Sequence, residues 1–306
     1  MHPGGLAAAR EAAALAPSDA RLALAHGLAL LEAERIAEAI AELQRALRLD
    51  YGLADARLAL GRAWLEAGEP DRALEALSRL EEDGEVSAQI ARAHAMKAQR
   101  RSDPGYVRHL FDQFAGDYDR RMIEQLGYGA PGILRELADL VMPGRERLAV
   151  LDLGCGTGLG GAAFADLAGR LDGVDLSPRM IEKARLRGIY DSLAVADIEG
   201  TLARDEADYD LMLAADTLVY LGALDGVFSG AARGLRPNGF FLFTVERKEN
   251  AGFELGPRRR WRHSESYLRE TAAGAGLAVA GLVSCVPRFE SKIPVEGLAV
   301  ALMRPA

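Results

Sequence analysis

Beyond about residue 145, short apolar runs alternate with amphipathic stretches along the chain. The runs have the length of buried β-strands, and the stretches between them place apolar residues three or four positions apart, as helices do. The expected strands are 148–153, 171–174, 192–196, 211–215, 240–245, 277–286 and 295–303, and the expected helices are 159–168, 178–187, 224–235 and 264–275. The alternation of the first five strands with helices predicts an α/β fold with a parallel, doubly wound sheet, and the last two runs bring the expected strands to seven.

The first hundred residues follow a different pattern, rich in Ala, Leu, Arg and Glu, which favours helices packed on helices. Three pairs of residues recur 34 positions apart: Gly27 and Gly61, Ala39 and Ala73, Leu43 and Leu77. This period is typical of tetratricopeptide repeats, although Ala23 and Arg57 replace the aromatic residue expected early in each repeat. We predict an all-α tetratricopeptide-like domain over residues 1–101, with a capping helix at 87–99. An ordinary antiparallel helical bundle is the alternative.

A polar segment that ends in a Pro-Gly pair, residues 100–105, separates the two patterns and predicts a domain boundary. From Tyr106 to Leu126, apolar residues recur every three or four positions, which predicts one helical segment. Another helix is expected at 131–141. We therefore assign residues 102–306 to the second domain, with its N-terminal helices at 106–145.

Composition and charge narrow the function classes. The 306 residues are 49% hydrophobic and 27% charged, a globular balance that fits two domains. The formal net charge of −8 gives no general attraction to nucleic acids or anionic membranes. The two cysteines, Cys155 and Cys285, are too few for a disulfide framework or a cysteine zinc site, so no metal is expected. No run approaches the ~20 apolar residues of a membrane span, and the N-terminus lacks a signal-peptide pattern, so a cytoplasmic protein is expected.

The first expected strand ends in a glycine-rich loop. Ligands of an open parallel sheet bind beyond the carboxyl ends of its strands, and Gly154, Gly156 and Gly158 would let a ligand approach the backbone there. Such a loop alone is also compatible with a nicotinamide dinucleotide. Asp152, just before the glycines, would repel a pyrophosphate and attract an ammonium group. The charge therefore disfavours the dinucleotide.

Two more carboxylates follow the next two strands. Asp175 can accept hydrogen bonds from two ribose hydroxyls, and Asp197, followed by Ile198, suits an adenine amine and ring. Together with Asp152 they suit a ligand that has an ammonium group, a ribose and an adenine but no phosphate, which describes S-adenosylmethionine. The alternative for each carboxylate is an ordinary cap at the end of a strand.

Four segments resemble the class I S-adenosylmethionine-dependent methyltransferases: VLDLGCGTG at 150–158, GVDLSPRMIEKAR at 173–185, VADIE at 195–199 and YDLMLAADTLVYL at 209–221. With the repeats in front, FDQFAGDYD at 111–119 and RRWRHSESYL at 259–268, the whole chain resembles bacterial tetratricopeptide-repeat methyltransferases. The resemblance implies a Rossmann-like class I methyltransferase sheet, S-adenosylmethionine as cofactor and S-adenosylhomocysteine as product.

The resemblance also implies a set of cofactor-binding residues. The methionine part would lie against Asp152, Gly154, Cys155 and Gly156, the ribose against Asp175, and the adenine against Asp197 and Ile198, while Leu176, Met180 and Asp216 complete the set. The helices at 106–145 would form a lid that contributes Tyr106, Phe111 and Tyr118. Cys155 is interpreted as a small loop residue rather than a nucleophile, and Tyr118 is alternatively a core residue of its helix.

The site of the methyl acceptor is expected after the fourth and fifth strands, with Asp216, Tyr220, Glu246 and His263 as catalytic candidates. His263 has an ordinary pKa suited to a base near neutral pH, although a histidine at a helix start is often structural. The arginine cluster at 258–262 either binds an anionic acceptor or forms a solvated loop. No Asn-Pro-Pro-Tyr motif follows the fourth strand, which weighs against methylation of nucleic-acid bases.

We therefore expect methyl transfer from S-adenosylmethionine to a small-molecule acceptor, or to one held by a carrier or protein. The repeats would serve as a docking module, which makes a protein partner conceivable, or would gate the substrate. A tetratricopeptide adaptor that only senses the cofactor is the first alternative. A nicotinamide oxidoreductase is the second.

Overall fold

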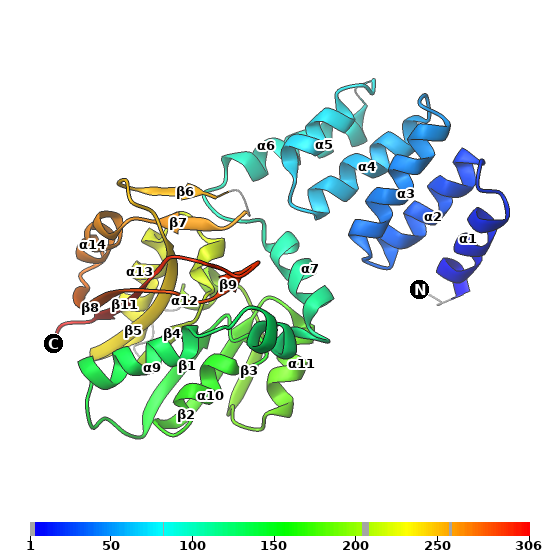
Figure 1. Ribbon diagram of the computed structural model, residues 1–306. Coiled ribbons are helices and arrows are strands. Elements are labelled where there is room, and N and C mark those ends of the chain that lie inside the picture. The colour runs from blue at the N-terminus through cyan, green and yellow to red at the C-terminus, as the bar shows by residue number, and fades with distance from the viewer. Residues whose placement is uncertain (1–3, 82, 204–207, 257–258) are drawn as a thin grey trace. The chain divides into compact units, whose positions relative to one another are not determined.

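The structure is a computed structural model that describes residues 4–81, 83–203, 208–256 and 259–306. The chain divides into two compact units, Met1–Gln99 and Arg100–Ala306, and each is described here by itself. Figure 1 shows the first unit as helices and the second as a sheet covered by helices.

Helices that pack in sequence order build the first unit. Their bounds are α1 Gly4–Leu15, α2 Ala20–Glu32, α3 Ile36–Leu49, α4 Ala54–Glu66, α5 Pro70–Leu77 and α6 Gly84–Ala98. The 34-residue period has a direct structural cause. A Cβ at Gly27 would lie 2.8 Å from the side chain of Leu43, and one at Gly61 would lie 2.6 Å from that of Leu77. In both repeats, therefore, the glycine lets a leucine of the next helix pack against the helix backbone.

The main sheet of the second unit has the strand order β3-β2-β1-β4-β5-β11-β8. The strands are β1 Leu148–Leu153, β2 Ala168–Asp175, β3 Ser192–Val195, β4 Tyr209–Ala214, β5 Leu235–Arg247, β8 Ala278–Cys285 and β11 Gly297–Met303. The expected parallel direction is confirmed for the strands β1 to β5, whereas β11, for which the alternation makes no prediction, is antiparallel to both of its neighbours. No helix lies between β8 and β11, and a short connection of this kind joins antiparallel strands rather than parallel ones.

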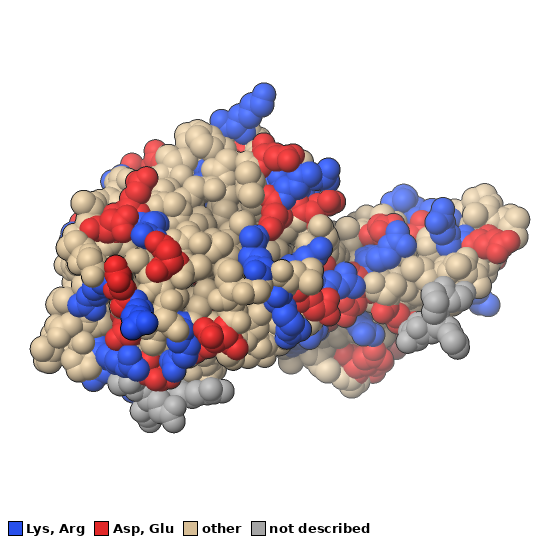
Figure 2. All heavy atoms as spheres, turned by 90° about the horizontal axis from the view of Figure 1, so that it is seen from below, with Lys and Arg blue, Asp and Glu red and all other residues tan. Residues whose placement is uncertain are grey.

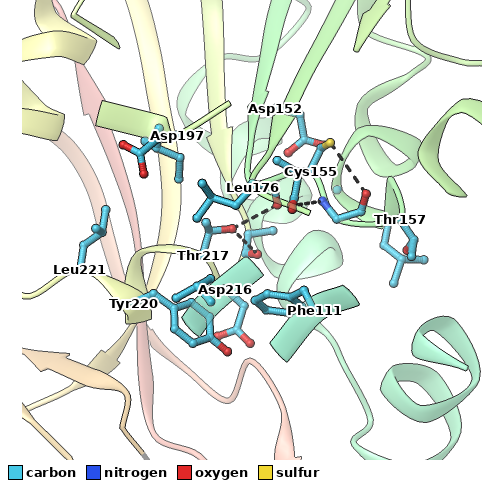
Figure 3. Close-up of a pocket in the computed structure, with 18 of the residues that line it drawn as sticks. Phe111, Asp152, Cys155, Thr157, Leu176, Asp197, Asp216, Thr217, Tyr220 and Leu221 are labelled. Carbon is cyan, nitrogen blue, oxygen red and sulfur yellow. Dashed lines mark hydrogen bonds between the residues drawn. The ribbon is translucent and has the colours of Figure 1, made fainter. Parts of the chain in front are cut away.

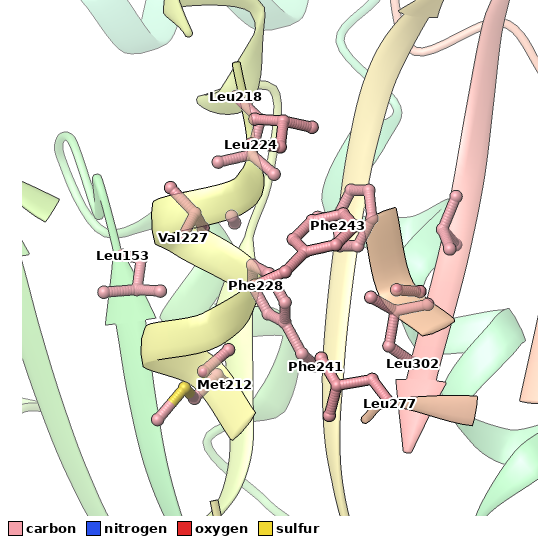
Figure 4. Packing of buried hydrophobic residues seen from close by; sticks show 14 of the residues in the cluster. Leu153, Met212, Leu218, Leu224, Val227, Phe228, Phe241, Phe243, Leu277 and Leu302 are labelled. Atoms are coloured by element: carbon pink, nitrogen blue, oxygen red, sulfur yellow. The ribbon is translucent and has the colours of Figure 1, made fainter. Parts of the chain in front are cut away.

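Alternate residues of the buried strands face two separate cores. One face packs against α12 Ile198–Leu202, α13 Asp225–Gly234 and α14 Glu265–Gly274, and Figure 4 shows Phe228 of α13 beside Phe241 and Phe243 of β5. The other face packs against α9 Ala130–Val141 and α10 Leu159–Phe164. Between β2 and β3 lies α11, Pro178–Leu186. This doubly wound arrangement brings the ends of β1, β2 and β4 to one edge.

The segment after residue 103 is not the single helix that its apolar period predicts. It forms α7 Pro104–Phe114, the short α8 Tyr118–Arg120 and the π-helical turn η1 Arg121–Gln125. Ala115, Gly116 and Asp117 separate α7 from α8, and the Asp103 side chain caps the start of α7 through the backbone N–H of Tyr106 at 3.0 Å. Tyr118 follows the break, and its ring meets that of Phe111 of α7 edge to face, with centroids 6.1 Å apart.

The region between β5 and α14 contains more structure than the solvated loop that was one of our expectations. Two short strands, β6 Phe253–Leu255 and β7 Trp261–His263, pair with each other, and β7 also pairs with β5. A second hairpin, β9 Phe289–Glu290 and β10 Ile293–Pro294, precedes β11. A 3-10 turn, η2 Leu218–Tyr220, follows β4. Arg258, one of the clustered arginines, lies outside the described residues.

Charges of both signs are interspersed on the face shown in Figure 2. None of the helices in the described ranges is long and apolar enough to cross a membrane.

Candidate active site at the strand ends

A pocket lies at the carboxyl ends of β1, β2 and β4. Its empty volume, open mouth included, is about 850 Å³. Figure 3 shows Asp152 and Asp197 at strand ends, with the rings of Phe111 and Tyr220 gathered beside Asp216. Its walls include most of the cofactor-binding set: Phe111, Tyr118, Asp152, Gly154, Cys155, Gly156, Asp175, Leu176, Asp197, Ile198 and Asp216.

The glycine loop after β1 needs glycine for two different reasons. Gly154 has a φ of +69°, and a Cβ there would lie 2.2 Å from Cγ2 of Thr217, so a side chain is sterically excluded. Gly156 has a φ of +55°, but a Cβ there would meet nothing within 4 Å. The space in front of Gly156 therefore lets a ligand lie close to the backbone.

Asp152 is almost completely buried beneath this loop. Its Oδ2 accepts a hydrogen bond of 2.8 Å from the hydroxyl of Tyr190. Burial raises the pKa of Asp152 to about 6, although hydrogen bonds from Tyr190 and the backbone of Gly161 act in the opposite direction. A cation that comes close to a buried carboxylate stabilises its ionised form, which burial otherwise disfavours. The same burial raises the pKa of the neighbouring Cys155 thiol, which keeps it protonated and poorly nucleophilic.

Asp175 ends β2 and joins two loops. Its Oδ2 accepts from the backbone N–H of Gly156 at 2.9 Å, and its Oδ1 accepts from that of Ser177 at 2.8 Å. Burial raises the pKa of Asp175 to about 6 against these hydrogen bonds. An ionised carboxylate offers about four lone-pair sites. Asp175 can therefore hold the glycine loop and still accept two hydrogen bonds from a ligand.

Asp197 has more hydrogen-bond and ion-pair partners within the protein than its position in the sequence suggests. It caps α12 through the backbone N–H of Glu199 at 3.0 Å, and its Oδ2 lies 2.5 Å from Nη2 of Arg101. Arg101 also pairs with the side chain of Glu199. Burial alone would raise the pKa of Asp197, but the hydrogen bonds and charge of Arg101 outweigh it and lower that pKa. Arg101, which we assigned to the repeat domain, thus contributes to the pocket in the second unit.

Two acidic side chains fasten the α7–α8 segment over the pocket. Asp112 of α7 is buried and accepts a hydrogen bond from the hydroxyl of Ser177. Asp119 of α8 accepts from the hydroxyl of Thr157 and pairs with Arg187. These contacts link the segment to the glycine loop and to the start of α11. The segment therefore covers the pocket in this structure.

A second cavity, which we term the adjoining cavity, shares walls with the pocket. The shared residues are Phe111, Tyr118, Asp216 and Tyr220. The rings of Phe111 and Tyr220 meet edge to face with centroids 5.5 Å apart. Burial raises the pKa of Tyr220, so its hydroxyl stays protonated and can donate a hydrogen bond. The adjoining cavity is where a second reactant could meet a ligand of the pocket.

Asp216 stands at this shared wall in a left-handed conformation, with a φ of +57°. Its backbone N–H donates to Oγ1 of Thr244 at 2.8 Å. Its side chain pairs with Arg288, a fully buried arginine that also pairs with Glu246 and, at 3.1 Å, with Glu290. Burial raises the pKa of Asp216, against the opposing charge of Arg288. The ion pair with Arg288 holds this carboxylate in place at the shared wall.

The structure separates the four catalytic candidates. Asp216 and Tyr220 line both cavities, whereas Glu246 lies apart from them in the ion-pair cluster around Arg288. His263 is fully buried, and its Nε2 lies 2.9 Å from the carbonyl oxygen of Gly222. Burial lowers the pKa of His263 to about 4, below the range expected for a base at neutral pH. The geometry thus brings two of the four candidates together.

Two members of the cofactor-binding set lie elsewhere. Met180 is fully buried in α11, and Tyr106 lines only the adjoining cavity. Conversely, sequence reasoning missed Arg101, Tyr128 and Thr217, which line the pocket, and Tyr190, whose hydroxyl reaches Asp152. Thr217 lies inside the segment after the fourth strand and was within reach of the strand-end argument. The other three come from segments distant in sequence, and no local signal marks them.

Comparison with known protein families agrees with this architecture. The model of a methyltransferase domain matches residues 150–239, and the model of a tetratricopeptide repeat matches residues 30–99. Human methyltransferase-like protein 27 is 33% identical over 137 residues, which cover 44% of this chain and 54% of that protein. The ubiquinone biosynthesis O-methyltransferase of Xanthomonas oryzae pv. oryzae is 31% identical over 110 residues, 35% of this chain and 46% of that enzyme.

The chain thus spans about half the length of the curated relatives it matches. Among solved structures, the 1,6-didemethyltoxoflavin-N1-methyltransferase of Burkholderia thailandensis, with bound 1,6-didemethyltoxoflavin and S-adenosylhomocysteine, has a TM-score of 0.51. It is 20% identical, and the match covers 64% of this chain and 88% of that one. This likeness concerns the fold. The chain therefore combines a tetratricopeptide-repeat region with a methyltransferase domain of the Rossmann-like class I fold.

Proposed function

We propose that the second unit binds S-adenosylmethionine in the strand-end pocket and transfers its methyl group to a small molecule in the adjoining cavity. The observation that carries the proposal is the charge of the pocket. Four carboxylates line it, those of Asp152, Asp175, Asp197 and Asp216, and Arg101 is the single cation among its described lining residues. Arg101 is already paired, so the pocket suits a cationic ligand better than a phosphate.

The residues present fit that cofactor. The open space before Gly156 would accept the methionine part, with its ammonium group directed to Asp152. The two unused lone-pair sites of Asp175 match the two ribose hydroxyls. Leu176 and Ile198 offer apolar walls for the adenine ring. Asp197 has fewer free acceptor sites for the adenine amine than its sequence position suggests. Its carboxylate oxygens already accept hydrogen bonds from Arg101 and from the backbone at the start of α12.

When bound, the cofactor supplies a methyl group on a positively charged sulfur, which is already activated for attack. The chain then has to orient the acceptor, exclude water and, where the acceptor carries a proton, remove it. Phe111 and Tyr118 of the covering segment would exclude water. Tyr220 can donate a hydrogen bond to the acceptor, and Asp216 can take its proton. His263 is not used in this scheme, since it is buried away from both cavities.

The acceptor side of the proposal rests on the adjoining cavity. Its empty volume, open space included, is about 1140 Å³, which leaves room for a small molecule. The name of the Xanthomonas relative supports an oxygen atom as the methyl acceptor. We further propose that the repeats dock a partner or gate access of the substrate. The helices of a tetratricopeptide-repeat region suit either role.

Methyl transfer can be tested directly on the full chain. The protein is incubated with methyl-labelled S-adenosylmethionine and an extract that contains both small molecules and proteins, and labelled products are separated by size. We expect label in a small product, and none with an Asp216→Asn variant that still binds S-adenosylhomocysteine. A wild-type protein that binds S-adenosylhomocysteine but labels nothing would support the cofactor-sensing adaptor instead. Label in protein would refute the small-molecule acceptor.

A further inference from the structure

The adjoining cavity is apolar along one side and charged at one end. The α7–η1 segment supplies apolar walls from Leu110, Phe114, Met122 and Leu126. Aromatic rings of Tyr106, Phe111, Tyr118 and Tyr220 also line it, as does Arg121, whose guanidinium lies 4.8 Å from the ring centroid of Phe114. A flat or apolar molecular body would therefore bury well against this wall.

Arg260 reaches the cavity from the residue just before β7. Its side chain is 23% exposed, and its guanidinium lies 5.9 Å from the ring centroid of Tyr220. Its Nη1 is buried 3.1 Å from Oε1 of Glu290 but makes no hydrogen bond of good geometry. A buried guanidinium nitrogen in this state can still bind an acceptor oxygen, which makes it a candidate anchor for a ligand.

The carboxylates around the cavity are already neutralised. Arg288 pairs with Asp216, Glu246 and Glu290 from behind the wall, and Arg262 lies 3.5 Å from Glu246. The charged side chains that line the adjoining cavity are two carboxylates, Asp216 and Glu290, and two guanidiniums, Arg121 and Arg260. Because Arg288 already pairs with both carboxylates, the cations exposed to the cavity are Arg121 and Arg260.

We propose that the methyl acceptor carries a carboxylate group, and that Arg260 binds this carboxylate while the apolar body of the acceptor lies against α7 and η1. The inference rests on the proposed function, since it concerns the second substrate of the same site. A guanidinium matches a carboxylate with two parallel hydrogen bonds, and in a largely buried site this pairing discriminates strongly against a neutral molecule of the same shape.

The test measures charge preference on the full chain saturated with S-adenosylhomocysteine. Calorimetry compares 4-hydroxybenzoate, 4-hydroxyphenylacetate, 3-(4-hydroxyphenyl)propanoate and indole-3-acetate with their neutral amides. We expect at least one carboxylate to bind about tenfold or more tightly than its amide, as for a charge-assisted pair. Arg260→Gln should abolish that preference. Arg260→Lys keeps the positive charge but cannot donate two parallel hydrogen bonds to a carboxylate, so it should retain part of the preference.

Arg262→Gln is the matched control, because Arg262 belongs to the same ion-pair cluster but does not line the adjoining cavity. It should leave the preference unchanged. Affinity for S-adenosylhomocysteine should stay within about twofold in every variant, which also shows that each is folded. No carboxylate preferred over its amide, or a preference that survives Arg260→Gln, would overturn the inference alone. Failure of the wild type to bind S-adenosylhomocysteine would instead refute the proposed function.

Discussion

Replacement of Asp175 by alanine separates its role in ligand binding from its role in the fold. In the proposed complex the carboxylate accepts two ribose hydroxyls through charge-assisted hydrogen bonds worth about 1.5–3 kcal/mol each. Two such bonds are worth about 3–6 kcal/mol, and every ~1.4 kcal/mol is a factor of ten, so Asp175→Ala should weaken S-adenosylhomocysteine binding by about a hundredfold or more.

The effect on folding should be much smaller, because two contributions oppose each other. The variant leaves the backbone N–H groups of Gly156 and Ser177 without their acceptor, at a cost of about 1–3 kcal/mol each where water cannot replace it. It also removes a buried carboxylate whose pKa is raised to about 6, which relieves about 3 kcal/mol at neutral pH. The two contributions largely cancel, and we expect the free energy of unfolding to change by no more than about 3 kcal/mol.

Calorimetric titration with S-adenosylhomocysteine measures the affinity, and thermal unfolding followed by circular dichroism measures the stability. Asp191→Ala is a matched control, because Asp191 accepts the backbone N–H of Leu171 at 2.8 Å but does not line the pocket. Its affinity should equal that of the wild type. Equal affinities of wild type and a folded Asp175→Ala variant would refute the assignment of Asp175 to the ribose.

Three further predictions follow from the geometry. Burial raises the pKa values of Asp152 and Asp175 to about 6, so S-adenosylhomocysteine affinity, measured by calorimetry, should fall as the pH drops through that value and both carboxylates are protonated. In the free protein these raised pKa values favour stability as the pH falls from about 6 to about 4, whereas His263, whose pKa is lowered to about 4, acts in the opposite direction. Denaturant titrations should therefore show the gain from Asp175 as a pH-dependent difference between wild type and Asp175→Ala. Gly61→Ala should destabilise the repeat unit by about 1–3 kcal/mol in thermal unfolding, because its Cβ would lie 2.6 Å from a leucine methyl, whereas Gly84→Ala, with nothing within 4 Å, should not. A chain that starts at residue 100 should bind S-adenosylhomocysteine like the full chain, and one that starts at residue 102 should bind it more weakly, because it lacks the ion pairs of Arg101. Equal affinity of the two truncated chains would contradict this role of Arg101.

The sequence predicts β1, β4, β5 and β11 well because each contains a continuous apolar run that is buried on both faces. The sequence does not predict features that depend on the direction of a strand or on contacts between segments distant in sequence. The apolar run of β11 carries no information on whether it is parallel or antiparallel to β5. The period of the segment after residue 103 continues through Gly116, where the chain breaks and turns. The β6–β7 hairpin is rich in arginine, and its strands are only three residues each, too short for a pattern.

The residues of the candidate site likewise fall into those that local sequence predicts and those that it does not. Asp152, Asp175 and the glycine loop are local features of strand ends, and the resemblance of their motifs to a known family gave their roles. The occupation of Asp197 by Arg101, the support of Asp152 by Tyr190 and the clamp of Arg288 on Asp216 join segments 38 to 96 residues apart. Such pairs exist only once the sheet has formed. His263 illustrates the reverse error, since its residue type suits catalysis but its burial does not.

The most direct test of the account is a calorimetric titration of the wild-type chain with S-adenosylhomocysteine and, separately, with NADH. Both ligands contain adenine and ribose, so the comparison isolates the effect of the strand-end carboxylates on an ammonium group and on a pyrophosphate. We predict saturable binding of one S-adenosylhomocysteine per chain and no measurable binding of NADH. Tighter binding of NADH, or no binding of S-adenosylhomocysteine by the folded chain, would contradict the account.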